Sequence, residues 1–205
     1  MMRRWFLRGA PGVLAFLSLL VATPGALHAQ RPPAATVVRV YAAFAPGSIR
    51  PGVLVTSRVS GQCFAASLAD QAREDAWRCM SGNRIMDPCF QGFEGANPVL
   101  ACPASPWSAR VTLLRSNKEP SRVQANKPGI GSGLPWALEL DDGTRCTFLT
   151  GATSAVAGMR VNYGCVGGQR SIVGDVDRTS PQWRVFVDTG RGATVESQGV
   201  RVAWY

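Results

Sequence analysis

The chain has 205 residues, a formal net charge of +9, six cysteines and one histidine. Its length predicts one domain, and its excess of basic residues favours anionic neighbours such as envelope polymers, acidic polysaccharide or nucleic acid, with nucleic acid favoured least. The alternative is a charge that only aids solubility. Because His28 lies in a segment that we expect to be removed, the mature chain lacks the commonest general base and metal ligand.

The first 29 residues have the pattern of an export signal. Its basic start, apolar run and small residues before the cleavage site are Arg3, Arg4 and Arg8, residues 13–22, and Ala26 and Ala29. The apolar run is too short to span a bilayer, although an uncleaved anchor is the alternative. Cleavage after Ala29 leaves residues 30–205 with a net charge of +6, and we expect this mature chain to be secreted or periplasmic, with no further membrane span.

Two strands are predicted first, at residues 36–44 and 53–59, where Val is frequent. Ser67 then begins a predicted short helix near residues 67–80, with Asp70 as its capping partner. Glu74 and Arg78 lie one turn apart on the outer face of this helix and are expected to pair.

Alternation returns at residues 110–116, and residues 117–135 then form a predicted long loop with three prolines and three glycines. A loop of this length is either functional or only connecting, and Lys118, Arg122 and Lys127 are its candidate binding residues.

The C-terminal third predicts a run of antiparallel strands, beginning at residues 136–140 with a hairpin turn at Asp142-Gly143. Further strands are expected at residues 144–149, 158–165, 169–173, 182–188 and 193–204. The predicted class is therefore mainly β or α+β: an antiparallel sandwich, barrel or curved sheet in one disulfide-stabilised domain, with one short helix.

An even number of cysteines in an exported chain predicts a disulfide framework. A reversal between a strand and the predicted helix would return Cys79 to Cys63. Cys89 and Cys102 flank a Gly- and Pro-containing loop, and Cys146 and Cys165 lie on two predicted strands. We therefore predict the pairs Cys63–Cys79, Cys89–Cys102 and Cys146–Cys165, on proximity alone.

Candidate ligand-binding residues are arginines on the polar faces of the predicted strands and tryptophans that flank the long loop. They are Arg145, Arg160, Arg184 and Arg201, with Trp107 and Trp136. If the strands are neighbours, the arginines form a basic stripe; the alternatives are an ordinary solvated sheet face for the arginines and core packing for the tryptophans.

Most familiar active sites are excluded. The segment Gly61–Ser67 is similar to the nucleophile segment of papain-like proteases, but that chemistry needs a histidine that the mature chain lacks. The chain has no C-x-x-C pair, which would have suggested zinc. Asp175 and Asp177 fit a turn better than a calcium-binding loop. We predict no catalytic, cofactor-binding or metal residues and lean against an enzyme. The alternative, a glycan hydrolase, would draw its two carboxylates from Glu74, Asp75, Asp87 and Glu94.

The block Arg78-Cys79-Met80-Ser81-Gly82-Asn83-Arg84-Ile85-Met86-Asp87-Pro88-Cys89-Phe90, with later segments around Cys102, Trp136, Cys146 and Cys165, resembles uncharacterised bacterial secreted proteins. The resemblance spans most of residues 60–205 and implies a single module with structural cysteines, but no activity or ligand. We therefore expect a non-catalytic envelope or extracellular binding module for an anionic or saccharide partner. The sequence leaves its oligomeric state open.

Overall fold

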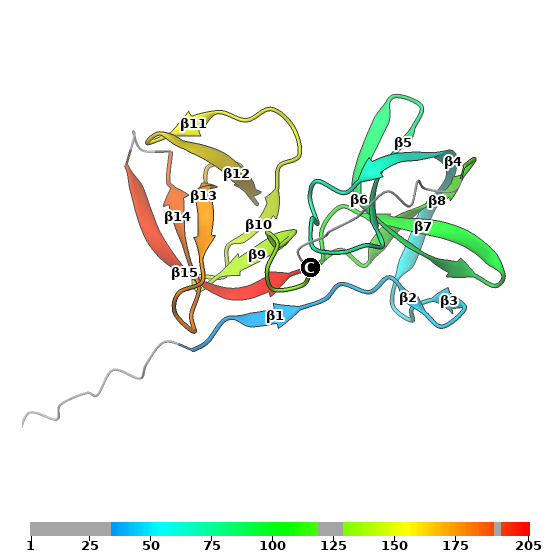
Figure 1. The fold of residues 1–205 in the computed structure, drawn as a ribbon, viewed down its shortest axis with the longest axis horizontal. Coiled ribbons are helices and arrows are strands. Elements are labelled where there is room, and N and C mark those ends of the chain that lie inside the picture. Colours follow the sequence, from blue (N-terminus) through cyan, green and yellow to red (C-terminus); the bar gives the residue numbers. More distant parts are fainter. Residues whose placement is uncertain (1–33, 119–128, 191–193) are drawn as a thin grey trace, which may run out of the picture. The chain divides into compact units, whose positions relative to one another are not determined.

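The computed structural model describes residues 34–118, 129–190 and 194–205, and these residues form an all-β fold without a helix (Figure 1). The strands are β1 (Val37–Arg39), β2 (Phe44–Ala45), β3 (Ser48–Ile49), β4 (Leu54–Ala66), β5 (Ala76–Ser81), β6 (Arg84–Glu94), β7 (Asn97–Pro103), β8 (Arg110–Ser116), β9 (Ala137–Leu140), β10 (Arg145–Phe148), β11 (Ala155–Val156), β12 (Met159–Cys165), β13 (Ser171–Asp177), β14 (Arg184–Asp188) and β15 (Val195–Trp204). The predicted antiparallel β-rich class is confirmed.

Strands β4 to β8 form a closed five-stranded barrel, drawn in cyan to green in Figure 1. Each strand pairs antiparallel with the next, and β4 closes the barrel by pairing in parallel with β8. A glycine is needed in β6, because a Cβ at Gly92 would lie 2.3 Å from the ring of Phe44. The short β2–β3 hairpin therefore packs directly on the barrel through Phe44.

The remaining strands form a six-stranded ring in the order β9–β10–β12–β13–β14–β15, which the pairing of β15 with β9 closes. Neighbours in the ring are antiparallel. Strand β1 runs parallel to the C-terminal half of β15, beside which Figure 1 shows it, and β11 pairs with β12. The predicted hairpin turn at Asp142-Gly143 joins β9 to β10.

The main hydrophobic core contains residues of both the barrel and the ring, and residues 33–205 form one compact unit. Trp136 lies within this core at 2% exposure, with its ring centroid 5.5 Å from that of Tyr41 and 5.5 Å from that of Phe90. Trp136 therefore has the core position that was the alternative to ligand binding. Packing of its large apolar ring against two other aromatic rings explains its burial.

Three disulfides join the pairs that the sequence predicts, Cys63–Cys79, Cys89–Cys102 and Cys146–Cys165, and no cysteine is free. All three connect neighbouring strands, but two differ from the expected geometry. Cys63 lies directly opposite Cys79 on β4 and β5, with no helix between them, and Cys89 and Cys102 close a hairpin of two long strands. Three disulfides indicate an oxidising compartment, either the periplasm or the cell exterior.

The helix expected near residues 67–80 is not formed: residues 67–75 are bends and turns, and β5 begins at Ala76. Ser67 does act as a capping residue would, because its Oγ accepts the Asp70 amide at 2.8 Å. Its own hydroxyl donates to Asp87 at 2.5 Å, and the Asp87 carboxylate also accepts the Leu68 amide at 3.1 Å. Ser67 and Asp87 thus accept the backbone amides of a turn in place of those of a helix. After the turn, the chain takes an extended conformation and pairs with β4.

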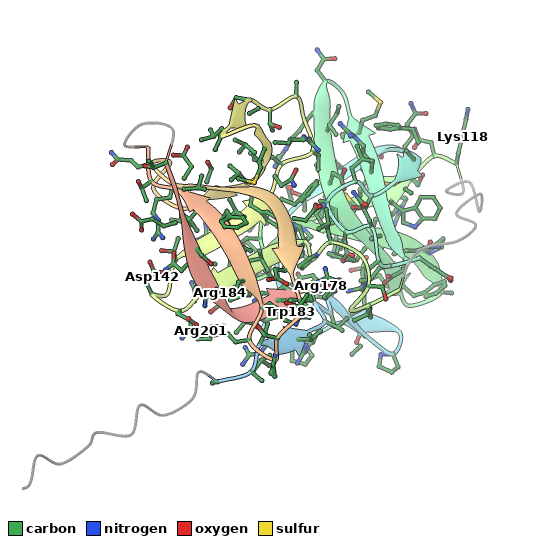
Figure 2. The ribbon with its side chains drawn as sticks, turned by 60° about the vertical axis from the view of Figure 1, so that its left-hand side comes forward. Lys118, Asp142, Arg178, Trp183, Arg184 and Arg201 are labelled. Atoms are coloured by element: carbon green, nitrogen blue, oxygen red, sulfur yellow. A yellow bond between two sulfur atoms is a disulfide. The ribbon has the colours of Figure 1, made fainter. Side chains whose placement is uncertain are left out.

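The expected export signal, residues 1–29, and residues 119–128 of the expected loop lie outside the described residues. The rest of that loop is tied to Arg178, which donates to the carbonyls of Gly131 and Gly133 at 2.6 Å each. The Arg178 guanidinium lies 4.6 Å from the ring centre of Trp183. Figure 2 labels both residues. Among the described residues, no helix has the length and apolar character to cross a membrane.

Candidate functional site

A carboxylate on the outer side of the ring organises the candidate site. Glu139 of β9 is only 6% exposed, although its neighbours Leu138 and Leu140 belong to the core on the other face of the strand. Its carboxylate accepts hydrogen bonds from the indole N–H groups of Trp107 and Trp204, the second at 3.2 Å, and from Arg201 at 2.6 Å.

The donors around Glu139 keep it ionised. Burial by itself raises the pKa of a carboxyl group, but the hydrogen bonds from Trp107, Trp204 and Arg201 and the charge of Arg145 outweigh it. The pKa of Glu139 is therefore lower than its ordinary value. An ionised carboxylate with three donors fixes the orientation of two indole rings and one guanidinium group.

A bulge in β15 brings Arg201 and Trp204 to this carboxylate. Val200 lies opposite Leu140 of the core, but the register shifts before Val202, which lies opposite Glu139. With strict alternation, the side chain of Arg201 would point to one face of β15 and those of Val202 and Trp204 to the other face. The extra residue at the bulge instead lets both Arg201 and Trp204 reach Glu139, which is the way bulges redirect side chains.

Two more arginines cover the indole rings. Arg145 of β10 lies opposite Glu139 in register, and its guanidinium carbon is 5.3 Å from the ring centre of Trp107, which comes from the β7–β8 connection. Arg39 of β1 lies beside Trp204, with its guanidinium carbon also 5.3 Å from the ring centre. Both distances fall within the range of cation–π attraction. We call the six residues the Arg–Trp cluster: Arg39, Trp107, Glu139, Arg145, Arg201 and Trp204.

The Arg–Trp cluster has an excess of positive charge at the surface. The cluster contains three guanidinium groups and one carboxylate, so that its net charge is +2. Arg39 and Arg145 are exposed, and the side chain of Arg201 is 54% exposed despite its ion pair with Glu139. Exposed guanidinium groups present planar N–H donors that match the oxygens of carboxylate, sulfate or phosphate.

Two adjoining hollows flank the cluster, and both are lined by Trp107, Arg145 and Arg201. The first, of about 610 Å³, extends to the Asp142–Thr144 turn and Val166. Figure 2 shows Asp142 and Arg201 near each other at this side of the ring. The second, of about 540 Å³, extends to Arg39 and Trp204.

The structure divides the predicted basic stripe. Arg145 and Arg201 share both hollows, whereas neither hollow is lined by Arg160 or Arg184. Arg160 donates to Thr153 at 3.0 Å, and Arg184 donates to Ser197 at 2.9 Å. Arg160 is thus held by the segment before β11, and Arg184 by the neighbouring strand β15.

Several other arginines are neutralised by acids. Arg58 pairs with Glu94 at 2.7 Å, Arg73 with Asp75 at 2.6 Å, and Arg170 with Asp142 at 2.6 Å. The pKa of Asp142 is far below its ordinary value, because hydrogen bonds led by that from Arg170 outweigh the effect of burial. These three arginines thus differ from the Arg–Trp cluster, in which three guanidinium groups lie near one carboxylate.

The four candidate carboxylates for glycan hydrolysis, Glu74, Asp75, Asp87 and Glu94, do not line the hollows of the Arg–Trp cluster. Asp75 and Glu94 are in the ion pairs just described, and Glu74 is exposed, while its expected partner Arg78 lies 4.0 Å from Asp87 instead. The Asp87 side chain is only 2% exposed, and burial raises its pKa although Ser67 and two backbone amides donate to it.

Sequence reasoning found three members of the cluster, Trp107, Arg145 and Arg201, and missed Arg39, Glu139 and Trp204. Glu139 had one usable signal, since it is an acid within an apolar strand beside predicted arginines. Arg39 and Trp204 depend on the parallel pairing of β1 with β15 and on the bulge, which local alternation does not encode.

No cluster of three or more acidic, cysteine or histidine side chains suited to a metal occurs in the described residues. Asp177, a candidate for calcium in the sequence, accepts hydrogen bonds from the amide and the hydroxyl of Thr179 within a turn.

Comparison of the chain with protein-family models, curated proteins and solved structures gave no match.

Proposed function

We propose that this protein is an exported, non-catalytic module that binds an acidic glycan of the cell envelope or its surroundings through the Arg–Trp cluster. One observation carries the proposal: Arg201 and two tryptophans donate to a single buried carboxylate, and two further exposed arginines lie over the indole rings, beside two hollows. The three disulfides support an oxidising compartment, and the N-terminal export signal and the resemblance to secreted proteins form part of the same proposal.

Physical reasoning supports an anionic ligand with sugar character. Guanidinium groups held by cation–π contact and by Glu139 have little conformational freedom left to lose, so that binding costs them less entropy. Serine and threonine hydroxyls of Ser105, Ser108 and Thr144 line the first hollow and suit a polar, hydroxyl-rich ligand.

Two alternatives are less well supported. A nucleic acid is bound through many phosphates, which favours an extended basic surface, but Arg58, Arg73 and Arg170 are engaged by acids and Arg178 by carbonyl oxygens. A glycan hydrolase needs two carboxyl groups facing one cleft, with one of them protonated. The acids that line the two hollows are Asp142 and Glu139, and both have lowered pKa values, so that neither is suited to donate a proton.

The test uses the oxidised mature chain, residues 30–205, on a column of immobilised polygalacturonate, with dextran as the neutral control. We expect retention at about 50 mM salt and release well before about 500 mM, because surface charge attraction is screened over a few ångströms at high salt. The double variant Arg145→Gln/Arg201→Gln should lose retention on the acidic polymer.

The matched control is Arg160→Gln/Arg184→Gln, which removes the same charge from the same ring outside the hollows. If this control loses as much retention as the cluster variant, binding is non-specific and the proposal is wrong. Equal behaviour of the wild type on dextran and polygalacturonate would also contradict it. Release of shortened polymer during the experiment would instead favour the hydrolase.

A further inference from the structure

The two hollows beside the Arg–Trp cluster differ in what lines them beyond the three residues that they share. The second hollow adds Arg39 and the indole of Trp204, so it carries the full set of three guanidinium groups. The first adds hydroxyl groups, the Asp142–Thr144 turn and Val166, and the acid in that turn is neutralised by Arg170. Both hollows therefore contain two guanidinium groups, and the second contains a third one.

We propose that the two hollows are consecutive subsites of one groove, which binds at least two adjoining units of an acidic polysaccharide along its chain. This inference rests on the proposed function and names the form of the ligand. Arg145 and Arg201 belong to both hollows, so a bound chain that passes from one to the other stays in contact with the same two guanidinium groups.

The size of the hollows supports an extended ligand. Ligand cavities commonly measure about 300–1,000 Å³, and each hollow falls within this range by itself, at about 610 Å³ and about 540 Å³. A single carboxylate or sulfate would contact the arginines and leave most of both hollows to water. A second linked unit adds contacts at little extra cost, because the first unit already holds it at high effective concentration.

The groups at the two ends of the groove allow the subsites to be separated. Arg39 lines only the second hollow, and Val166, which is 77% exposed, lines only the first. Arg39→Gln removes charge from one end. Val166→Asp places a negative charge at the other end, on an exposed side chain with little part in the core.

The experiment measures the affinity of the mature chain for galacturonic acid and for its oligomers of two and four units by calorimetry. We expect the wild type to bind the dimer and tetramer at least about tenfold more tightly than the monomer. Val166→Asp should remove most of this gain while leaving monomer affinity within about twofold, since the monomer binds among the three arginines. Arg39→Gln should weaken ligands of every length, and Arg160→Gln is the matched control that should change nothing.

Equal affinity for monomer and tetramer overturns the two-subsite groove but leaves the proposed function in place, as does a Val166→Asp variant that binds all lengths like the wild type. Failure of every length to bind overturns the proposed function together with this inference. Tighter binding of a single-stranded oligonucleotide of equal charge than of the tetramer overturns the choice of polysaccharide. Thermal unfolding of each variant checks that a lost affinity is not a lost fold.

Discussion

The five-stranded barrel and the six-stranded ring are both closed sheets, but they are stabilised in different ways. The barrel has its own small buried cluster, in which Trp77 packs with two disulfides. The ring has one disulfide, and its large apolar residues, such as Leu138 and Ile172, belong to the main core. Covalent links thus supplement burial where the apolar cluster is small. The ring, with a single disulfide, bears the bulge and the ionised carboxylate of the candidate site.

The largest effect on stability is expected when disulfides are removed from the barrel or from the ring. Replacing Cys63, Cys79, Cys89 and Cys102 by alanine should lower the free energy of unfolding by about 6 kcal/mol, and replacing Cys146 and Cys165 by about 3 kcal/mol, at about 3 kcal/mol for each bridge. The three bridges span similar separations of 16, 13 and 19 residues, so the number of bridges sets the difference. Urea unfolding measures both losses.

Hydrogen exchange then shows which strands have lost stability. In the four-cysteine variant, amide protection should fall in β4–β8 and persist in β9–β15, because the ring keeps its disulfide and its share of the main core. Equal losses of stability in the two variants, or protection lost first in the ring, would show that the barrel does not depend on its disulfides more than the ring does.

The second prediction contrasts two tryptophans. Trp136→Ala should lower the free energy of unfolding by about 3–5 kcal/mol, because it leaves a large cavity between Tyr41 and Phe90. Trp107→Ala removes a partly exposed ring and one hydrogen bond to Glu139, so about 1 kcal/mol is expected, with loss of binding to acidic polymer. Thermal unfolding and column retention should respond in opposite order for the two variants; parallel responses would contradict their assigned roles.

The sequence predicted the ring much better than the barrel. Strand β8 and the strands from β9 to β15 other than β11 were predicted, and their predicted ranges lie within a few residues of those observed. The short β11 was not predicted. Strands β6 and β7 were missed because Pro88, Gly92 and Pro98 break the local pattern. Tertiary pairing overrides those breakers, and Gly92 is there for contact with Phe44 rather than for a turn.

The predicted helix shows a second limit. The apolar face of the predicted helix was Leu68, Ala72, Ala76 and Cys79; the last three are buried, but Leu68 is 43% exposed. In the structure a turn and a strand bury those three residues, so a short periodic pattern does not distinguish the two. The sequence likewise predicted only part of the candidate site, because local alternation does not show which strands are neighbours. Alternation identified Arg145 and Arg201, but only the closed ring and its bulge show that they share Glu139.

The third prediction concerns the turn that replaces the helix. Asp87→Ala should lower the free energy of unfolding by about 2 kcal/mol, because it leaves the Ser67 hydroxyl and the Leu68 amide without their acceptor. Asp87→Asn keeps one acceptor oxygen, removes a desolvated charge and should cost less. Urea unfolding of both variants makes the comparison. A larger loss for the asparagine variant would mean that the negative charge, through Arg78, matters more than the acceptor atoms.

The smallest effect lies in the ring and depends on pH. The pKa of Glu139 is lower in the folded protein than its ordinary value of 4.5, so its contribution to stability is fully present above about pH 4.5 and is lost as the pH falls through the folded pKa. Glu139→Gln cannot titrate, and the variant should therefore lose less stability than the wild type when the pH is lowered from about 5 to about 3. Unfolding free energies of the two proteins across this interval give the difference. Parallel curves would mean that Arg201 and the two indoles do not favour the ionised form, and that the Arg–Trp cluster is held together without its carboxylate charge.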